Sequence, residues 1–464
     1  MEGTSAPQPL PGGVLEVRKH PRKGRTLHTS RLVKGGEVVL SEAPLLLLVA
    51  PDMADNTCAA CLRAVAPTGC LPCAGCRQAV FCGPTCQQEA MTTPWVHSPP
   101  ICSAYARLAS MSVGSEEASQ MRFLLHALAL RHGGTEEAGR RFAALLELTG
   151  EPGGADLATA TRLAPLLAGA LADAPGGPPQ LNPAELAALL RKEQLNSYGV
   201  LAAPSQLRRG AVASGAGPSG GGCSTEAAAA DEGADGERRL RGSAVYAQAS
   251  LINHECLPNV ARFDAFDGGP SSSAGSSAQP STCAPTTAPS SSSTHVAFRA
   301  LHDLPAGTEL AASYVPLHWR LAERQAQCRE VYGFSCTCPR CQTESQWSDE
   351  DEDSEWETDS GGDAAMQEQG ADEEAGGNGA TEDEDADGGE VEMEEATGPI
   401  SAPPGEEGPL EPAYLRLFLL KYMCARPGCF GTAAPPTPGS ALLECNVCGA
   451  TRSEQDFLRE LERR

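Results

Sequence analysis

Three features are missing from this 464-residue sequence. Residues 1–13 contain no apolar run, so we expect no secretory signal. The longest apolar run, at residues 45–50, is far shorter than the roughly 20 residues that cross a bilayer. No segment repeats along the chain. These absences predict a soluble, intracellular protein that has no membrane partner.

A basic excess is missing as well. Of the 60 acidic residues, 24 lie at positions 349–407, where there is no Lys or Arg. The remaining 36 acidic residues nearly balance the 35 basic ones, so the net charge of −25 belongs to one segment. Because no basic stripe accompanies the rest of the chain, we do not expect direct DNA binding.

What the sequence does contain is 19 cysteines. A reducing intracellular compartment keeps thiols free, so these cysteines are predicted to bind metal and not to form disulfides. Gly and Pro are also abundant, 86 residues together, and they concentrate in a few segments. The chain is therefore expected to alternate folded and unfolded segments.

Three segments are predicted to be disordered. Residues 202–240 are rich in Gly, Ala and Ser, and residues 267–294 are rich in Ser, Thr and Pro. Both read as insertions, which are tolerated because loop-closure entropy grows slowly with length. Residues 346–411 form an acidic linker with too little apolar content to fold.

Strands are predicted where short β-branched or apolar runs are bounded by Gly, Pro or basic residues. Two of them lie near the N-terminus, at 14–17 and 38–40. Three more flank the two insertions, at 196–201, 244–263 and 295–301.

Helices are predicted across residues 103–195. The apolar stretch 121–130 ends in a basic turn followed by two Gly, which is a helix stop signal. Thr135 begins another helix that runs through Leu148. Asn182 followed by Pro183 is a cap and first-turn signal for the last helix.

The first cysteine cluster holds eight candidate zinc ligands. A CxxC turn places two thiolates on one short loop, and zinc takes four ligands in a tetrahedron, so eight ligands make two sites. The alternative is a cluster of buried free thiols, but pairs at this spacing seldom arise without a metal. The eight residues are Cys58, Cys61, Cys73, Cys76, Cys82, Cys86, His97 and Cys102.

Two further clusters follow. Cys336, Cys338 and Cys341 form a CxCxxC motif that needs a fourth ligand, for which Cys256 is the best candidate. The last cluster is arranged like a zinc ribbon, and its alternative, a disulfide pair, is disfavoured in a reducing compartment. Its residues are Cys424, Cys429, Cys445 and Cys448.

Three motifs in order carry a family resemblance. The segment 253–259, Asn-His-Glu-Cys-Leu-Pro-Asn, resembles the central signature of SET-domain lysine methyltransferases. The segment 307–314, a Gly-x-Glu-Leu run ending in Tyr, resembles their second signature. The CxCxxC resembles their post-SET zinc motif, whose site is completed by the Cys of the first signature. A β segment, a MYND-like finger and a helical stretch precede them, which is the order of the SET-and-MYND family.

The resemblance covers nearly all of residues 14–342 and implies a fold. That fold is a mostly β SET domain, a β-clip or pseudoknot, split by a MYND zinc finger and a helical insertion, giving a zinc-rich α+β protein with long disordered insertions. The terminal ribbon resembles one seen in some members. The implied segments are the N-terminal part of SET at 14–50, the MYND finger at 51–102, the helical SET insertion at 103–195, the core SET at 196–325, the post-SET zinc motif at 326–345 and the ribbon-like module at 412–464.

The resemblance also implies S-adenosylmethionine-dependent methylation of a protein lysine, on a histone or another protein. It implies Tyr314 as the catalytic residue. It implies that the substrate channel is formed by Tyr198, Ser250 and Tyr332. The residues it implies for cofactor binding are Gly24, Arg25, Asn196, Asn253, His254 and Phe334.

For zinc, the resemblance implies a cross-braced finger. One finger site would be formed by Cys58, Cys61, Cys82 and Cys86, and the other by Cys73, Cys76, His97 and Cys102. With one post-SET zinc and one in the ribbon, this makes four ions. The alternative function is an inactive SET and MYND scaffold that binds proline-containing peptides in transcriptional regulation. Either protein would work in the nucleus, the cytoplasm or both.

Methyl transfer from a sulfonium to an amine makes definite demands on such a site. Donor and acceptor must be aligned about 3 Å apart with water excluded. The lysine must be neutral, and an aromatic channel lowers its pKa by desolvation. The chain departs from the family at Thr26, where a Gly is usual, at the four-residue gap between His97 and Cys102, and at the extra Cys70. A positive φ at Thr26 would disfavour cofactor binding.

Overall fold

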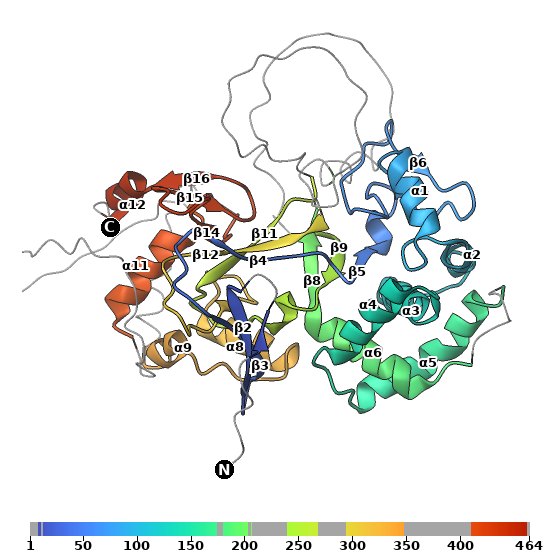
Figure 1. Ribbon diagram of the computed structural model, residues 1–464, viewed down its shortest axis with the longest axis horizontal. Helices are drawn as coiled ribbons and strands as arrows, with labels where there is room; N and C mark the ends of the chain where they lie inside the picture. The colour runs from blue at the N-terminus through green and yellow to red at the C-terminus, as the bar shows by residue number, and fades with distance from the viewer. Residues whose placement is uncertain are drawn as a thin grey trace, which may run out of the picture.

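The computed structural model describes residues 8–10, 13–173, 180–202, 206, 239–267, 294–347 and 410–461. The predicted insertions at 202–240 and 267–294 and the acidic linker at 346–411 lie outside these ranges except at their ends and at residue 206. The described chain is an α+β protein built from several small sheets (Figure 1). None of its helices is long and apolar enough to span a membrane.

Three small antiparallel sheets form the centre of the molecule. The first has the order β1-β2-β3, the second β11-β12-β4 and the third β5-β9-β8. Their strands are β1 (Gln8–Pro9), β2 (Leu15–His20), β3 (Gly24–Thr29), β4 (Val38–Glu42), β5 (Leu46–Val49), β8 (Ser197–Leu201), β9 (Leu240–Val245), β11 (Val260–Asp264) and β12 (Val296–Ala300).

The order of these strands joins segments that are far apart in the sequence. β12 lies between β4 and β11, with Phe298 opposite Leu40 on one side and Arg262 on the other. Alternate residues of β12 are buried, as one covered sheet face requires. Val296 and Phe298 therefore join a core that also contains Leu27 and Ile252.

Four of the five predicted strand segments are confirmed. The exception is 244–263, which the structure divides. β9 ends at Val245, a short turn η2 (Ala249–Leu251) follows, then β10 (Asn253–His254), and β11 begins only at Val260. This division matters because β10 leaves the antiparallel sheets and pairs elsewhere.

The helices between residues 84 and 196 gather on one side of the sheets, at the right of Figure 1. The predicted caps are present: the Thr135 hydroxyl accepts from the Ala138 N–H at 3.1 Å, and the Asn182 carboxamide from the Ala184 N–H at 3.0 Å. Pro183 occupies the first turn, as predicted. The helices are α1 (Pro84–Thr92), α2 (Pro99–Leu108), α3 (Ser115–His132), α4 (Glu136–Glu147), α5 (Gly154–Ala170) and α6 (Pro183–Asn196).

The C-terminal part of the described chain packs on the opposite side of the sheets (Figure 1). Leu415, Phe418 and Tyr422 form one apolar cluster with Leu301 and Leu317. The elements here are α8 (Leu321–Glu330), α9 (Pro339–Glu344), α11 (Pro412–Tyr422), β14 (Ala433–Ala434), β15 (Leu442–Cys445), β16 (Thr451–Ser453) and α12 (Glu454–Leu461). The finger side carries η1 (Pro51–Met53), β6 (Leu71–Pro72) and β7 (Val80–Phe81).

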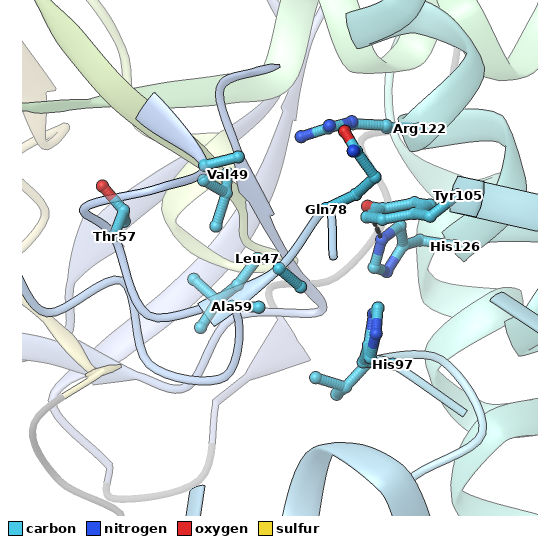
Figure 2. Close-up of a pocket in the computed structure, with 12 residues that line it drawn as sticks. Leu47, Val49, Thr57, Ala59, Gln78, His97, Tyr105, Arg122 and His126 are labelled. Atoms are coloured by element: carbon cyan, nitrogen blue, oxygen red, sulfur yellow. Dashed lines mark hydrogen bonds between the residues drawn. The ribbon is translucent and has the colours of Figure 1, made fainter. Parts of the chain in front are cut away.

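A small cavity of about 10 Å³ marks the junction between the cysteine-rich finger and the helices. Figure 2 shows Arg122, Tyr105, His126 and His97 along one wall, with Leu47, Val49 and Ala59 across from them. The Tyr105 hydroxyl lies 2.8 Å from His126 Nε2, and His126 Nδ1 lies 2.7 Å from the Trp95 carbonyl oxygen. A buried polar chain thus fixes α2 and α3 against the finger.

The buried His126 should make the protein sensitive to acid. Burial lowers its pKa to about 4, against about 6.5 in an unfolded chain. Protonation then favours unfolding, so the stabilisation is complete above pH 6.5 and is lost as pH falls towards 4. From pH 7 to pH 5, the free energy of unfolding of wild type should fall by about 2 kcal/mol more than that of His126→Gln. The glutamine keeps one donor and one acceptor for the two contacts of the histidine. Urea unfolding at both pH values measures this loss.

The matched control is His132→Gln, which changes an exposed histidine at the end of the same helix. This control should lose as much stability as wild type between the two pH values. Equal losses in His126→Gln and wild type would show that His126 does not govern the acid response.

Candidate functional site

The candidate site is built on a short parallel pairing between β10 and β13 (Ala311–Ala312). Asn253 lies opposite Ala311, and His254 lies opposite Ala312. The side chain of Asn259 strengthens the pairing, because its oxygen accepts from the Ala311 N–H at 2.9 Å and its amide donates to the Glu309 carbonyl at 2.8 Å. The two motifs, more than 50 residues apart, are therefore held in fixed register.

This register places His254 directly against Tyr314. The Tyr314 backbone N–H donates to His254 Nδ1 at 3.0 Å, and the ring centroids are 5.3 Å apart. Burial lowers the pKa of His254 to about 4, so the ring is neutral at physiological pH. Since Nδ1 accepts a hydrogen bond, the proton sits on Nε2, which lies 3.3 Å from Cys256 Sγ.

The Tyr314 hydroxyl is held by the backbone in front of β10. It donates to the Ile252 carbonyl at 2.7 Å. Burial raises the pKa of Tyr314 well above that of an ordinary tyrosine, so the phenol stays protonated at neutral pH. Tyr314 thus presents a fixed, neutral hydroxyl group at this position.

An aromatic wall extends from Tyr314. The Tyr332 ring lies 4.9 Å from the Tyr314 ring, and the Phe334 ring lies 5.8 Å from His254 and 6.4 Å from Tyr332. Both residues come just before Cys336, in the loop between α8 and α9. Four predicted site residues are therefore brought together around one aromatic surface.

Two of the predicted cofactor-binding asparagines use only the amide nitrogen in hydrogen bonds. Asn196 donates twice through Nδ2, to the carbonyls of Thr149 and Lys192, both at 2.7 Å. Asn253 donates through Nδ2 to Glu309 Oε1 at 3.1 Å. Neither Oδ1 accepts a hydrogen bond from the part of the chain that the structure describes. These oxygens are acceptors without a donor.

Gly24 and Arg25 are the first two residues of β3, and the Arg25 carbonyl oxygen lies 3.5 Å from Asn253 Nδ2. Gly24 has a φ of +76°, which a residue with a side chain disfavours, and Arg25 donates to the Glu147 carbonyl at 2.5 Å. Thr26 is buried in β3 opposite Arg18 and is not among the described residues with a positive φ. The substitution at Thr26 therefore causes no backbone strain.

Tyr198 and Ser250 lie beneath this surface, and their hydroxyls are engaged by the backbone. Tyr198 donates to the Ala249 carbonyl at 2.8 Å and packs on Tyr246 with ring centroids 5.6 Å apart. Ser250 donates to the Tyr246 carbonyl at 2.6 Å. Because both hydroxyls already donate to backbone carbonyls, these two predicted channel residues would contribute mainly through packing.

Two carboxylates of the site were not predicted. Glu309 accepts from Asn253, as above, and from Lys23 Nζ at 2.9 Å, so it orients the Asn253 amide. Its position inside the Gly-x-Glu-Leu motif was an available signal. Glu42 accepts from the backbone N–H groups of residues 247–249 at 2.8–3.0 Å, just before β10. No local pattern marks Glu42.

Four groups of cysteine and histidine side chains are suited to hold metal ions. In each, the ligand atoms all lie within 4.8 Å of one another. Zn–S bonds of about 2.3 Å in a tetrahedron put sulfurs roughly 3.8 Å apart. The measured pairs agree, with 3.8 Å for Cys61–Cys82 and 3.6 Å for Cys256–Cys341. The groups are Cys58, Cys61, Cys82 and Cys86; Cys73, Cys76, His97 and Cys102; Cys256, Cys336, Cys338 and Cys341; and Cys424, Cys429, Cys445 and Cys448.

This grouping is the one that the sequence resemblance implies, including the cross-bracing of the finger and the distant Cys256. The four-residue gap between His97 and Cys102 is accommodated within the second group. Cys70 stays outside it, and its sulfur lies 3.4 Å from the Pro67 carbonyl oxygen. Both departures in the finger therefore leave the ligand sets intact.

No protein-family model matches the sequence, but several known proteins are similar to it. The histone-lysine N-methyltransferase ASHR2 of Arabidopsis thaliana is 29% identical over 473 residues, which cover 96% of this chain and 97% of that protein. The histone-lysine N-methyltransferase SMYD3 of Mus musculus is 30% identical over 108 residues, 23% of this chain and 19% of its own. A SET and MYND domain-containing protein of Dictyostelium discoideum is 28% identical over 104 residues, 22% of this chain and 20% of its own.

The small sheets and the four cysteine-rich groups define a sheet-rich α+β protein suited to bind zinc. The chain is similar to ASHR2 over nearly its whole length and to SET-and-MYND proteins over shorter stretches, and these similarities support a SMYD-type methyltransferase family.

Glu42 should be needed to hold the segment that leads into the site. In Glu42→Gln, an amide NH₂ replaces one of the two oxygens that face backbone N–H groups. Leaving buried donors unpaired costs about 1–3 kcal/mol, so unfolding by urea should show a loss of this size. The control Glu136→Gln, whose side chain is 86% exposed, should change stability by less than about 0.5 kcal/mol. Equal stability of the two variants would argue against the anchoring role.

Proposed function

We propose that this protein is an S-adenosylmethionine-dependent protein-lysine N-methyltransferase with a SET fold. The observation that carries the proposal is the β10–β13 pairing, which sets Asn253 and His254 beside Tyr314 and its aromatic wall. In this proposal, the crossing of segments 253–259 and 307–314 is the SET pseudoknot. The names of the relatives, histone-lysine and N-lysine methyltransferases, support the same activity.

The residues around the site suit the cofactor. S-adenosylmethionine supplies an electrophilic methyl group on a sulfonium and carries an ammonium on its amino-acid end. The free Oδ1 atoms of Asn196 and Asn253 are acceptors without donors in the described chain, which fits an ammonium. Gly24 and Arg25 would bound the amino-acid end. His254 and Phe334 would hold and cover the adenine.

The same residues would prepare the lysine. Tyr314 and Tyr332, whose rings are in contact, would line an apolar channel together with Tyr198 and Ser250. Such a channel disfavours the charged ammonium, lowers the lysine pKa and leaves the amine neutral for attack. The fixed Tyr314 hydroxyl and the Ile252 carbonyl that it contacts would align the amine with the methyl group.

Zinc is assigned a structural role. Two ions would sit in the finger, one at Cys256, Cys336, Cys338 and Cys341, and one in the C-terminal group. Groups with four protein ligands leave no open coordination position for chemistry. The third ion would fix the loop that carries Tyr332 and Phe334.

The substrate would be a protein with an exposed lysine, a histone or another protein, met in the nucleus or the cytoplasm. We propose that this enzyme has six segments in order along the chain. They are the N-terminal SET part, the finger, the helical insertion, the core, the post-SET motif and the terminal ribbon-like module. Direct DNA binding is not part of the proposal.

A second function is favoured by a groove on the finger. This open groove of about 470 Å³ runs along α1 and exposes Met91, Pro84 and Gln87. An apolar groove edged by glutamines suits an extended proline-containing peptide. The protein would then also act as a scaffold in transcriptional regulation. If the SET part is inert, this scaffold role would be its whole function.

Tyr314→Phe separates the enzyme from the scaffold. Loss of the hydroxyl should reduce methyl transfer by about 100-fold, because the group acts at the reacting atoms. Cofactor binding should persist, so 100 Kd of S-adenosylmethionine should stabilise variant and wild type alike by about 2.7 kcal/mol. Radiolabelled methyl transfer to proteins of a cell extract and thermal melts measure the two effects.

The control is Tyr414→Phe in the C-terminal α11, which should leave transfer unchanged. Transfer by Tyr314→Phe at the wild-type rate would remove the catalytic assignment. No transfer and no cofactor-induced stabilisation in wild type would favour the scaffold alone.

Zinc content offers an independent test. We expect about four zinc ions per chain by atomic emission, since each group has four suitable ligands. Cys445→Ala should lower the content by one. Cys70→Ala, which changes a cysteine outside every group, should retain all four. An unchanged content in Cys445→Ala would contradict zinc binding at the C-terminal group.

A further inference from the structure

Two arginines and a glutamate are buried against the third cysteine group. Arg324 of α8 and Arg340 of α9 are both 0% exposed, and the Glu344 side chain between them is 2% exposed. Buried charges are costly unless they are paired and hydrogen-bonded, so such a cluster requires an explanation.

Arg324 contacts the cysteine group directly. Its Nε lies 3.3 Å from Cys256 Sγ, and its Nη2 lies 3.7 Å from Cys341 Sγ and forms an ion pair with Glu344. Four thiolates around one Zn²⁺ carry a net charge of about −2, and the two guanidinium groups with Glu344, which together carry +1, offset it in part. Glu344 also pairs with Arg340 Nε at 2.6 Å, so it keeps the two cations together. The guanidinium of Arg324 is therefore the nearest counter-charge to this metal group.

The same arginines hold the segment that follows Tyr314. Arg324 Nη1 donates to the Trp319 carbonyl at 2.6 Å, and Arg340 Nη1 donates to the Leu317 carbonyl at 2.9 Å. These carbonyls lie three and five residues after Tyr314. One side chain, Arg324, thus touches two metal-group sulfurs and the backbone that leads from Tyr314.

We propose that Arg324 is a positioning residue that couples metal retention at the Cys256 group to the placement of Tyr314. The consequence for catalysis rests on the proposed methyltransferase function, whereas the coupling itself does not. A lysine at this position keeps the charge but lacks the planar fork, so it cannot reach the sulfurs and the Trp319 carbonyl at once.

The experiment compares Arg324→Met, Arg324→Lys and the control Arg329→Met, which changes an exposed arginine of the same helix. Zinc affinity is measured by chelator competition, and protection of the amides of residues 314–320 by hydrogen exchange. For Arg324→Met we expect zinc binding at one site to weaken by about 10-fold or more and the segment to exchange faster. For Arg324→Lys we expect near-normal zinc affinity but faster exchange. Arg329→Met should match wild type in both.

The kinetic readout is a fall in kcat in both Arg324 variants at an unchanged KM for the protein substrate, since Tyr314 and not the substrate surface is displaced. The proposal is overturned if Arg324→Met binds zinc like wild type, or if Arg324→Lys shows wild-type exchange at 314–320. If Arg324→Met does not fold, the hydrogen exchange of residues 314–320 in Arg324→Lys tests the proposal by itself. Absence of methyl transfer in wild type would refute the proposed function, while the zinc and exchange measurements would still decide the coupling.

Discussion

The rest of the site depends on one parallel contact between two very short strands, Asn253–His254 and Ala311–Ala312. A two-residue pairing is weak by itself. It persists because the Asn259 side chain adds one hydrogen bond to Ala311 and one to Glu309 just before the strand, and because His254 accepts from the Tyr314 backbone. Slipping the register by one residue would turn His254 away from Tyr314 and break all three contacts. The pairing therefore fixes the position of His254 against Tyr314, where the aromatic wall begins.

Cysteine groups hold together segments that short strands could not hold alone. Cys256 lies two residues after the end of β10, and its partners Cys336, Cys338 and Cys341 come some 80 residues later. The group ties the loop with Tyr332 and Phe334 to the β10 segment, so the aromatic wall cannot drift from Tyr314. The finger is secured similarly, by two groups of its own and by the buried contacts of His126 with Tyr105 and Trp95. In the described part of the chain, these cysteine groups thus join segments that belong to separate small sheets or to none.

Features with a local sequence pattern were predictable. The caps Thr135 and Asn182, the strand segments near the N-terminus and the paired cysteines each have a signature within a few residues. Cys256 was assignable because the CxCxxC lacked a fourth ligand. In contrast, Glu42 accepts hydrogen bonds from backbone N–H groups that lie about 205 residues further along the chain. Nothing in the sequence around Glu42 indicates that contact. The break between Val245 and Val260 was missed because an apolar run does not show where the chain changes sheets. The role of Tyr198 in the channel stays a prediction, and no local pattern indicated that its hydroxyl would donate to the Ala249 carbonyl.

The most direct measurement is a crystal structure of the protein with S-adenosylhomocysteine. We predict that the ligand lies with its ammonium between the Oδ1 atoms of Asn196 and Asn253, its ring against Phe334 and its sulfur facing the Tyr314 hydroxyl. Density for the ligand elsewhere, or an Asn196–Asn253 site that stays closed at saturating ligand, would contradict the assignment of this site.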